Sequence, residues 1–423
     1  MGVRVRAAVA IAGCGLGGLA ALCAEAQPAD PWLDDASREM IQDADGQAAL
    51  IAEAQQIGNP LAGYDGRFFL ASDDGQQRLN LGGYAQIRYY ANFNDNDAGT
   101  PTDDFESGFQ LERVRLIFSG RLREGTTFLL LPFTGSNGRL SILDAWIKQD
   151  LGGGFAVQAG QFKLPFFREW LISERFIQPV ERSTLSQIYA SIYSQGVQAT
   201  YTEGPLQLAL AYSDGLRTLN TPFAGGGSEI EAESGGVTAR LQYLPFGDRR
   251  DFLDITSLNN REPGLLLGVA AHWQGPTEAF FGTDVNHVFQ YTADASYETD
   301  GFNLFGAFVG RHIDPAGGGS DENSFGFLAQ AGVFVNKNVE LVGRYTALLP
   351  DSGADGNNTF NEVAIGVNYY ALVHALKLTG DLLYFFDDTA GTTVIGFGPS
   401  TTTGLLASTG NQAAIRLQLQ FIF

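Results

Sequence analysis

The chain has 423 residues, of which 53 are glycine and 12% are aromatic, and its 47 acidic residues outnumber its 26 basic ones. A formal net charge of −21 argues against a nucleic-acid-binding protein, which needs a basic surface to neutralise phosphates. Both cysteines, Cys14 and Cys23, lie near the N-terminus, which excludes disulfides, zinc–cysteine sites and cysteine nucleophiles from the rest of the chain.

The first 26 residues have the pattern of an export signal. Two arginines precede an uncharged stretch over 7–24, and Ala24-Glu25-Ala26 provides the small-x-small pattern of a cleavage site. We predict a signal peptide at 1–26 that is removed before Gln27. The alternatives are a lipoprotein whose lipid is attached to Cys14, and a retained helical anchor.

Residues 27–63 are predicted to form a periplasmic helix followed by a linker. Asp34 and Ser37 can accept hydrogen bonds from the free N–H groups at a helix start, and Gly58-Asn59-Pro60 would end the helix. One interpretation is a short coiled coil or a contact with the cell wall. The other, which the weak pattern favours, is an amphipathic helix that packs on the main domain or is partly disordered.

From Arg78 onward, apolar and polar residues alternate with a period of two, which is typical of β-strands. Near the end of the chain, Ile415 and Leu417 share one face, whereas Arg416 and Gln418 lie on the other. Sixteen segments are predicted to be strands on this basis. They are 78–92, 109–121, 126–134, 139–150, 155–163, 193–202, 205–213, 236–245, 264–274, 285–298, 301–311, 325–336, 339–348, 360–370, 375–386 and 411–423.

The predicted connections alternate between short turns and long loops. Outer-membrane barrels combine tight periplasmic turns with long external loops, whereas a soluble sandwich has no reason to sort its loops in this way. The segment 246–263 is the exception, because it is long and charged but falls among the short turns. The long connections are 93–108, 164–192, 214–235, 312–324, 349–359 and 387–410.

The strand number and the loop pattern together predict where this protein lies in the cell. Sixteen strands enclose a lumen too wide for side chains to fill, so the apolar faces must point outward into lipid and the polar faces inward into water. We expect an all-β fold, a 16-stranded antiparallel transmembrane β-barrel over 64–423, preceded by a short N-terminal helix. After cleavage of the signal peptide it would lie in the bacterial outer membrane. The terminal Phe423 is the expected signal through which the last strand engages the outer-membrane assembly machinery.

Several segments of this sequence resemble those of one known family, the phosphate-selective porin O/P family. The resemblance spans roughly 64–423 and is firmest over 78–192 and at the C-terminus. It implies a 16-stranded outer-membrane porin, usually a homotrimer, whose third loop, here 164–192, folds inward and narrows the pore. The matching segments are Leu79–Tyr89, Phe109–Gly120, Asp144–Ile147, Gly160–Phe166, Glu181-Arg182-Ser183 and Arg416–Phe423.

Strand parity places five arginines on the inner face of the predicted barrel. If Val114 and Leu116 face lipid, their neighbours Arg113 and Arg115 face the pore, and a charge facing lipid at mid-depth would cost about 2–4 kcal/mol. These arginines could form a track that favours anions, or could brace the wall by pairing with acidic residues such as Glu112 and Asp144. The two roles can coexist. The predicted pore-wall residues are Arg88, Arg113, Arg115, Arg240 and Arg416.

The third long loop is the best candidate for the pore constriction. With Lys163 it carries one more basic than acidic residue, because three arginines oppose Glu169, Glu174 and Glu181. One interpretation is a constriction that selects solutes by charge, and the other is a loop pinned to the wall by its own ion pairs. The predicted constriction residues are Lys163, Arg168, Arg175 and Arg182, and Arg217 is expected to lie away from them in an external loop.

We therefore expect a porin for passive diffusion of small hydrophilic solutes, anionic or neutral, with a weak preference for anions such as phosphate. No cofactor, metal or nucleic acid is expected, and lipid and a homotrimer are the expected partners. The alternative is a structural barrel with a closed pore that contacts the cell wall. An enzyme is not expected, since the chain has four histidines and neither a Gly-x-Ser-x-Gly nor a His-Glu-x-x-His motif.

Overall fold

The computed structural model describes residues 61–94, 105–134, 140–190, 193–220, 232, 234–258, 261–280, 283–351, 359–387, 403–406, 408 and 410–423. The predicted signal peptide and the predicted helix within 27–63 lie outside these residues.

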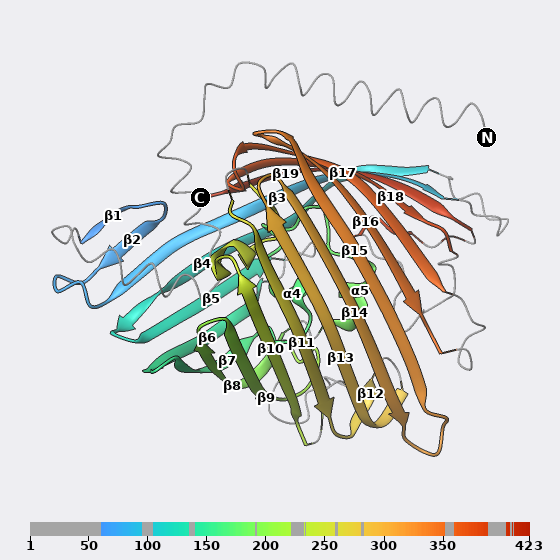
Figure 1. Cartoon of the computed structure of the whole chain (residues 1–423), viewed down its shortest axis with the longest axis horizontal. Helices are drawn as coiled ribbons and strands as arrows, with labels where there is room; N and C mark the ends of the chain where they lie inside the picture. The colour runs from blue at the N-terminus through green and yellow to red at the C-terminus, as the bar shows by residue number, and fades with distance from the viewer. Residues whose placement is uncertain are drawn as a thin grey trace.

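Sixteen of the described strands form one closed antiparallel barrel (Figure 1). Each strand pairs with the next along the chain, and β19 pairs back onto β3, for example at Leu417 and Tyr89, which closes the ring. The 16-stranded barrel is therefore confirmed, and every predicted strand corresponds to an observed one. The ring consists of β3 (Arg78–Asn94), β4 (Phe105–Arg123), β5 (Thr126–Thr134), β6 (Leu140–Gly152), β7 (Phe155–Phe162), β8 (Ser194–Glu203), β9 (Leu206–Ser213), β10 (Gly236–Phe246), β11 (Gly264–Gln274), β13 (Thr283–Thr299), β14 (Phe302–Pro315), β15 (Glu322–Asn336), β16 (Val339–Leu349), β17 (Phe360–Leu372), β18 (Leu376–Phe385) and β19. The last of these covers Gln412–Ile422.

Several short elements outside the ring were not predicted. The hairpin of β1 (Ala62–Tyr64) and β2 (Phe68–Ala71) extends the sheet beyond the start of β3, where Phe68 pairs with Leu81. A further strand, β12 (Thr277–Phe280), pairs with β13. Segments of three or four residues are too short for a period of two to be recognised in the sequence.

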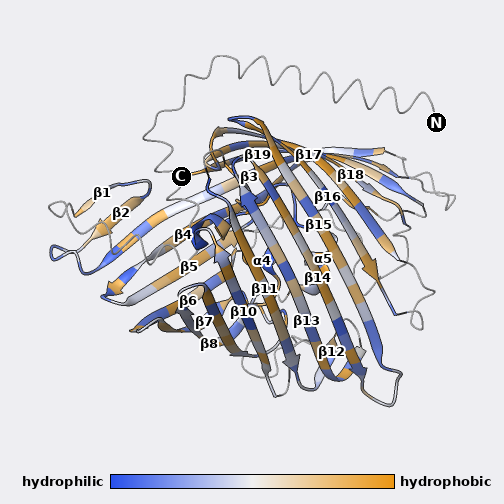
Figure 2. Cartoon of the chain, viewed as in Figure 1, coloured by the Kyte–Doolittle hydropathy of each residue, from blue (hydrophilic) through white to orange (hydrophobic). Residues whose placement is uncertain are grey.

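The barrel wall is apolar outside and largely polar inside. Along β10, Val237 and Leu241 are exposed on the outer face, whereas Thr238 and Arg240 are buried on the inner face. Figure 2 shows the resulting alternation of hydrophobic and hydrophilic residues along the strands. None of the helices among the described residues is long and apolar enough to cross a membrane.

One half of the inner face departs from the polar pattern that we expected. On β14 and β15, the inward-facing positions include Phe305, Val309 and Leu328, which are fully or almost fully buried. These side chains belong to an apolar cluster that also contains residues of the long connection between β7 and β8. The inner face of this half is therefore covered by protein rather than by water.

Candidate pore constriction

The connection between β7 and β8 spans residues 163–193, and its described residues, 163–190 and 193, fold into the barrel and include two short helices. These are α4 (Arg168–Leu171) and α5 (Thr184–Tyr189), and both are drawn within the ring of strands in Figure 1. The hydroxyl oxygen of Ser183 caps α5 by accepting a hydrogen bond from the N–H of Ser186. We call residues 163–193 the inner loop. The sequence predicted that this segment is the constriction, but it did not predict the helices.

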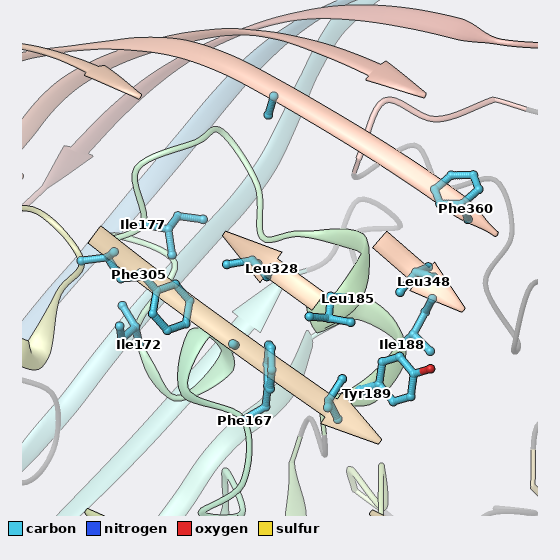
Figure 3. Packing of buried hydrophobic residues seen from close by; sticks show 14 of the residues in the cluster. Phe167, Ile172, Ile177, Leu185, Ile188, Tyr189, Phe305, Leu328, Leu348 and Phe360 are labelled. Carbon is cyan, nitrogen blue, oxygen red and sulfur yellow. The ribbon is translucent and has the colours of Figure 1, made fainter. Parts of the chain in front are cut away.

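The inner loop docks on the wall through apolar contacts (Figure 3). Leu185 and Ile188 of α5 pack beside Leu328 and Leu348, and Phe167 lies near Phe305. Burying an apolar side chain of this size contributes about 1.5–3 kcal/mol. The inner loop therefore packs against the inner face of β14–β18.

Glu181 holds the inner loop to the strands β3 and β4. Its Oε2 lies 2.9 Å from Arg88 Nη1 and 2.6 Å from Arg113 Nη2, and all three side chains are buried. Burial alone would raise the pKa of Glu181, but Arg113 and Arg88 outweigh burial and hold this pKa well below its usual range. The carboxylate is therefore ionised, as a buried charge with two partners should be.

A second set of ion pairs ties the loop to itself and to β4 and β16. Glu169 lies 3.4 Å from Arg344 and accepts hydrogen bonds from both the N–H and the hydroxyl of Ser183. Glu174 pairs with Arg182 at 3.1 Å and also with Arg115. Burial raises the pKa of Glu169, against the effect of Arg344. The acidic residues of the inner loop thus serve to pin it, which was one of the two interpretations left open by the sequence.

The five predicted pore-wall arginines all lie on the inner face, and all five pair with an acidic residue of the loop or the wall, Arg115 with Glu174 as described above. Arg88 and Arg113 hold Glu181. Arg240 pairs with Asp294 at 2.8 Å and donates to the carbonyl of Phe166 in the loop. Arg416 pairs with Asp381 at 2.6 Å, and Asp381 accepts a hydrogen bond from the N–H of Val180. These contacts correspond to the bracing role, whereas an anion track stays a prediction.

The four predicted constriction residues do not share one environment. Lys163, Arg168 and Arg175 line the internal cavity that remains beside the inner loop. Arg182 does not line it, because its guanidinium donates inside the loop to the carbonyls of Glu169 and Ile172. Burial lowers the pKa of Arg168 to about 10 and also lowers the pKa of Arg182, so Arg168 keeps its charge at neutral pH.

The cavity beside the inner loop has a volume of about 240 Å³, and most of the charged residues that line it are cations. It lies between the loop and the strands β3 to β11. Its acidic lining residues are Asp144 and Glu174, and Glu174 is already paired with arginines. The cations that line it are Arg115, Lys163, Arg168, Arg175, Arg240 and Arg249. The lining thus carries more cations than acids in a strongly acidic protein, although Arg115 is paired with Glu174 and Arg240 is paired with Asp294 behind the lining.

The unusual turn between β10 and β11 also reaches into the barrel, a role that the sequence analysis missed. It contains the 3₁₀ helix η2 (Arg249–Leu253), and Phe252 and Asp254 are buried. Asp254 lies 3.0 Å from Arg261 and 3.4 Å from His374 across the end of the barrel. The exceptional length and charge of this segment were the signal that could have revealed its role.

Arg217 lies elsewhere than expected. We predicted an external position away from the constriction, but its guanidinium donates to the carbonyls of Gln187 and Ile188 at the end of α5, the second at 3.0 Å. Burial lowers the pKa of Arg217 to about 9. Arg217 therefore contacts the inner loop directly instead of lying away from it.

In the described part of the chain, no group of three or more His, Cys, Asp or Glu residues is arranged to hold a metal ion. His272 and His374 are buried, and His287 pairs with Asp314 at 3.2 Å.

Comparisons with known proteins agree with this geometry. A family model described as phosphate-selective porin O and P matches residues 84–300. A search of curated proteins found no match. Among solved structures, the anion-selective porin from Comamonas acidovorans is similar with a TM-score of 0.58 at 14% identity, covering 82% of this chain and 99% of that one.

Two further solved structures have the same fold. The outer membrane channel DcaP of Acinetobacter baumannii gives a TM-score of 0.53 at 15% identity and covers 83% of this chain and 99% of that one. The outer-membrane OmpT of Vibrio cholerae gives a TM-score of 0.55 at 8% identity, and the match covers 82% of this chain and 98% of that one. At such identities the likeness establishes the fold alone.

Proposed function

We propose that this chain, which belongs to the phosphate-selective porin O and P family, passes small anions by diffusion through the cavity beside the inner loop. As a member of this family it is a porin of the bacterial outer membrane, and its barrel has the architecture of a channel. The proposal concerns the preference of the pore, which we take to be weakly in favour of anions such as phosphate.

One observation carries the proposal, namely the excess of cations around the cavity. Six basic and two acidic residues line it, although the whole chain has a net charge of −21. Charges are screened over about 8–10 Å at ordinary salt, so acidic residues in distant loops should influence a passing ion less than the lining residues do. In a narrow, low-dielectric passage the local charge decides which ions enter.

The preference should be weak because the basic residues are already partly engaged with the protein. Lys163 Nζ lies 3.3 Å from the carbonyl oxygen of Leu171, and Arg175 Nε lies 3.1 Å from Ser173 Oγ. A cation that keeps such contacts attracts an anion without replacing its whole hydration shell. Shallow binding of this kind allows release on the far side.

The test is charge reversal at Lys163 and Arg175, two cavity-lining residues of the inner loop that donate to uncharged oxygens. The double variant Lys163→Glu, Arg175→Glu should shift the permeability ratio of refolded channels in planar bilayers from chloride toward potassium and abolish any block of chloride current by phosphate. The matched control is Lys337→Glu, which reverses the charge of an exposed lysine in a short turn. An equal shift in the control would refute the role of the cavity.

The maturation and assembly of the porin are also part of the proposal. We propose that residues 1–26 are removed before Gln27, that residues 27–63 hold the periplasmic helix and linker up to the start of β1 at Ala62, and that residues 64–423 hold the barrel with the constriction at 164–192. The mature barrel assembles in outer-membrane lipid as a homotrimer, with Phe423 engaging the assembly machinery. The intact mass of the membrane-extracted protein tests the cleavage site, and a lipidated mass beginning at Cys14 would contradict it.

The alternative of a closed, structural barrel makes a different prediction. Such a protein would show no conductance in a bilayer even when correctly folded. The family match and the structural neighbours give this alternative no support.

A further inference from the structure

An apolar strip runs along the inner wall of the cavity, at positions where a water-filled pore would be expected to carry polar residues. Ile117 of β4, Leu129 and Leu131 of β5, and Trp146 of β6 all line the cavity. Register confirms that they share one face, because Leu129 pairs with both Ser119 and Trp146, and Ser119 and Trp146 are buried on the inner side. The strip continues under the inner loop through Phe162.

The strip and three of the cations come from different parts of the cavity lining. Lys163, Arg168 and Arg175 belong to the inner loop, whereas the apolar strip belongs to the wall formed by β4, β5 and β6, where Arg115 and Asp144 also line the cavity. Amide side chains from β7 to β10, such as Gln158 and Gln207, line the wall between them. A solute in the cavity would therefore meet a positive side, a hydrogen-bonding side and an apolar side.

This combination suits one class of anion better than it suits inorganic phosphate. Phosphate is hydrated over its whole surface, so contact with Leu129, Leu131 and Trp146 offers it no hydrogen bonds in return for lost water. A carboxylate with an apolar body can place its charge near Lys163 or Arg175 while its body displaces water from the strip. Ligand sites commonly combine a mainly apolar lining with a few polar groups that fix orientation.

We propose that the pore prefers small organic carboxylates with a compact aromatic or aliphatic body over both inorganic phosphate and short, fully hydrophilic anions. The inference rests on the proposed anion preference and adds the solute class to it. The volume of about 240 Å³ limits such a solute to roughly the size of a single ring or a short chain.

The test compares solutes that share a charge and differ in their apolar part. In planar bilayers, the concentration of benzoate that halves the chloride current of the wild type should be about tenfold lower than that of acetate, because the ring adds apolar area that leaves water. Benzoate should also halve the chloride current at a lower concentration than phosphate does, and at a lower concentration than its neutral analogue benzamide does. Equal half-blocking concentrations for benzoate and acetate, or tighter block by phosphate or benzamide than by benzoate, would overturn the inference.

Two variants locate the effect on the strip. Leu131→Gln should reduce the benzoate-to-acetate preference by at least about threefold, since an amide replaces apolar contact area. Leu143 belongs to the same buried apolar cluster but does not line the cavity, so Leu143→Gln is the matched control and should leave the ratio unchanged. An unchanged ratio in Leu131→Gln, or an equal loss in the control, would contradict a role for the strip.

The two proposals fail in different ways. If the wild type prefers potassium over chloride, the anion preference itself is wrong. If the wild type prefers chloride but does not distinguish benzoate from acetate, the anion preference stands and only the solute class is wrong.

Discussion

Glu181 is the residue on which the position of the inner loop depends most directly. Its carboxylate is buried between Arg88 and Arg113, at 2.9 and 2.6 Å, and these arginines belong to neighbouring strands of the wall. Removing Glu181 leaves the two arginines with Glu112 alone, whose Oε1 lies 3.8 Å from Arg88 and 3.9 Å from Arg113, and breaking a buried ion pair typically costs about 3–5 kcal/mol. We therefore expect Glu181→Gln to lower the free energy of unfolding by this amount in detergent micelles, measured by urea denaturation. The exposed Glu124→Gln is the control and should change the free energy little.

The low pKa of Glu181 in the folded protein predicts that the stability of the protein against urea depends on pH. The pKa of Glu181 in the folded protein is held below the ordinary value of 4.5 by Arg113 and Arg88 despite burial. Because the pKa of Glu181 is lower in the folded protein than in the unfolded chain, the ionised carboxylate stabilises the fold fully above its unfolded pKa. This stabilisation is lost as the pH falls toward the pKa of the folded protein. The urea midpoint of the wild type should therefore fall between about pH 5 and pH 3 by more than that of Glu181→Gln. Parallel falls in the two proteins would contradict this assignment.

At the scale of elements, the docking of α5 depends on a glycine in the facing strand. A Cβ at Gly326 of β15 would collide with Leu185 Cδ1 and would lie 3.4 Å from the carbonyl oxygen of Ala347. Gly326→Val should therefore cost about 1–3 kcal/mol by overpacking and push α5 toward the cavity, which lowers the single-channel conductance. A Cβ at Gly343 of the next strand would meet nothing within 4 Å, so Gly343→Val should leave the conductance unchanged. Equal conductance in the wild type and Gly326→Val would mean that a shift of α5 does not reach the passage.

The strands and the inner loop differed in how far the sequence could predict them. A period of two is a local property, so all sixteen strands of the ring were found from neighbouring residues alone. The inward fold of the loop was expected from the family resemblance, but its docking rests on contacts such as Glu181 with Arg88 and Leu185 with Gly326, between residues far apart in the chain. Parity predicted that Arg240 and Arg416 face inward, but not that Asp294 and Asp381 would pair with them. The contacts of the buried Arg182 with Glu169 and of Arg217 with Gln187 could not be predicted for the same reason.

At the scale of the whole molecule, the last residue completes the barrel. The N–H of Phe423 donates to the carbonyl of Gly83, and the carbonyl of Phe423 accepts from the N–H of Gly83, both at 2.9 Å. Deleting Phe423 removes these two closing bonds, so the folded form should lose its resistance to SDS at a lower temperature on gel-shift analysis. Leu419→Ala, which truncates an exposed outward-facing side chain in the same strand, is the control and should have the smaller effect. A larger effect in the control would argue against a closing role for Phe423.

The central claim is that a locally positive cavity gives an acidic barrel a preference for anions. The chain as a whole carries a net charge of −21, so its overall charge and its cavity predict opposite signs of selectivity. The most direct measurement is the zero-current potential of the wild-type channel in a planar bilayer with a KCl gradient. We predict a potential of the sign produced by chloride moving down its gradient faster than potassium. A potential of the opposite sign would contradict the claim, and so would a correctly folded barrel that conducts no current.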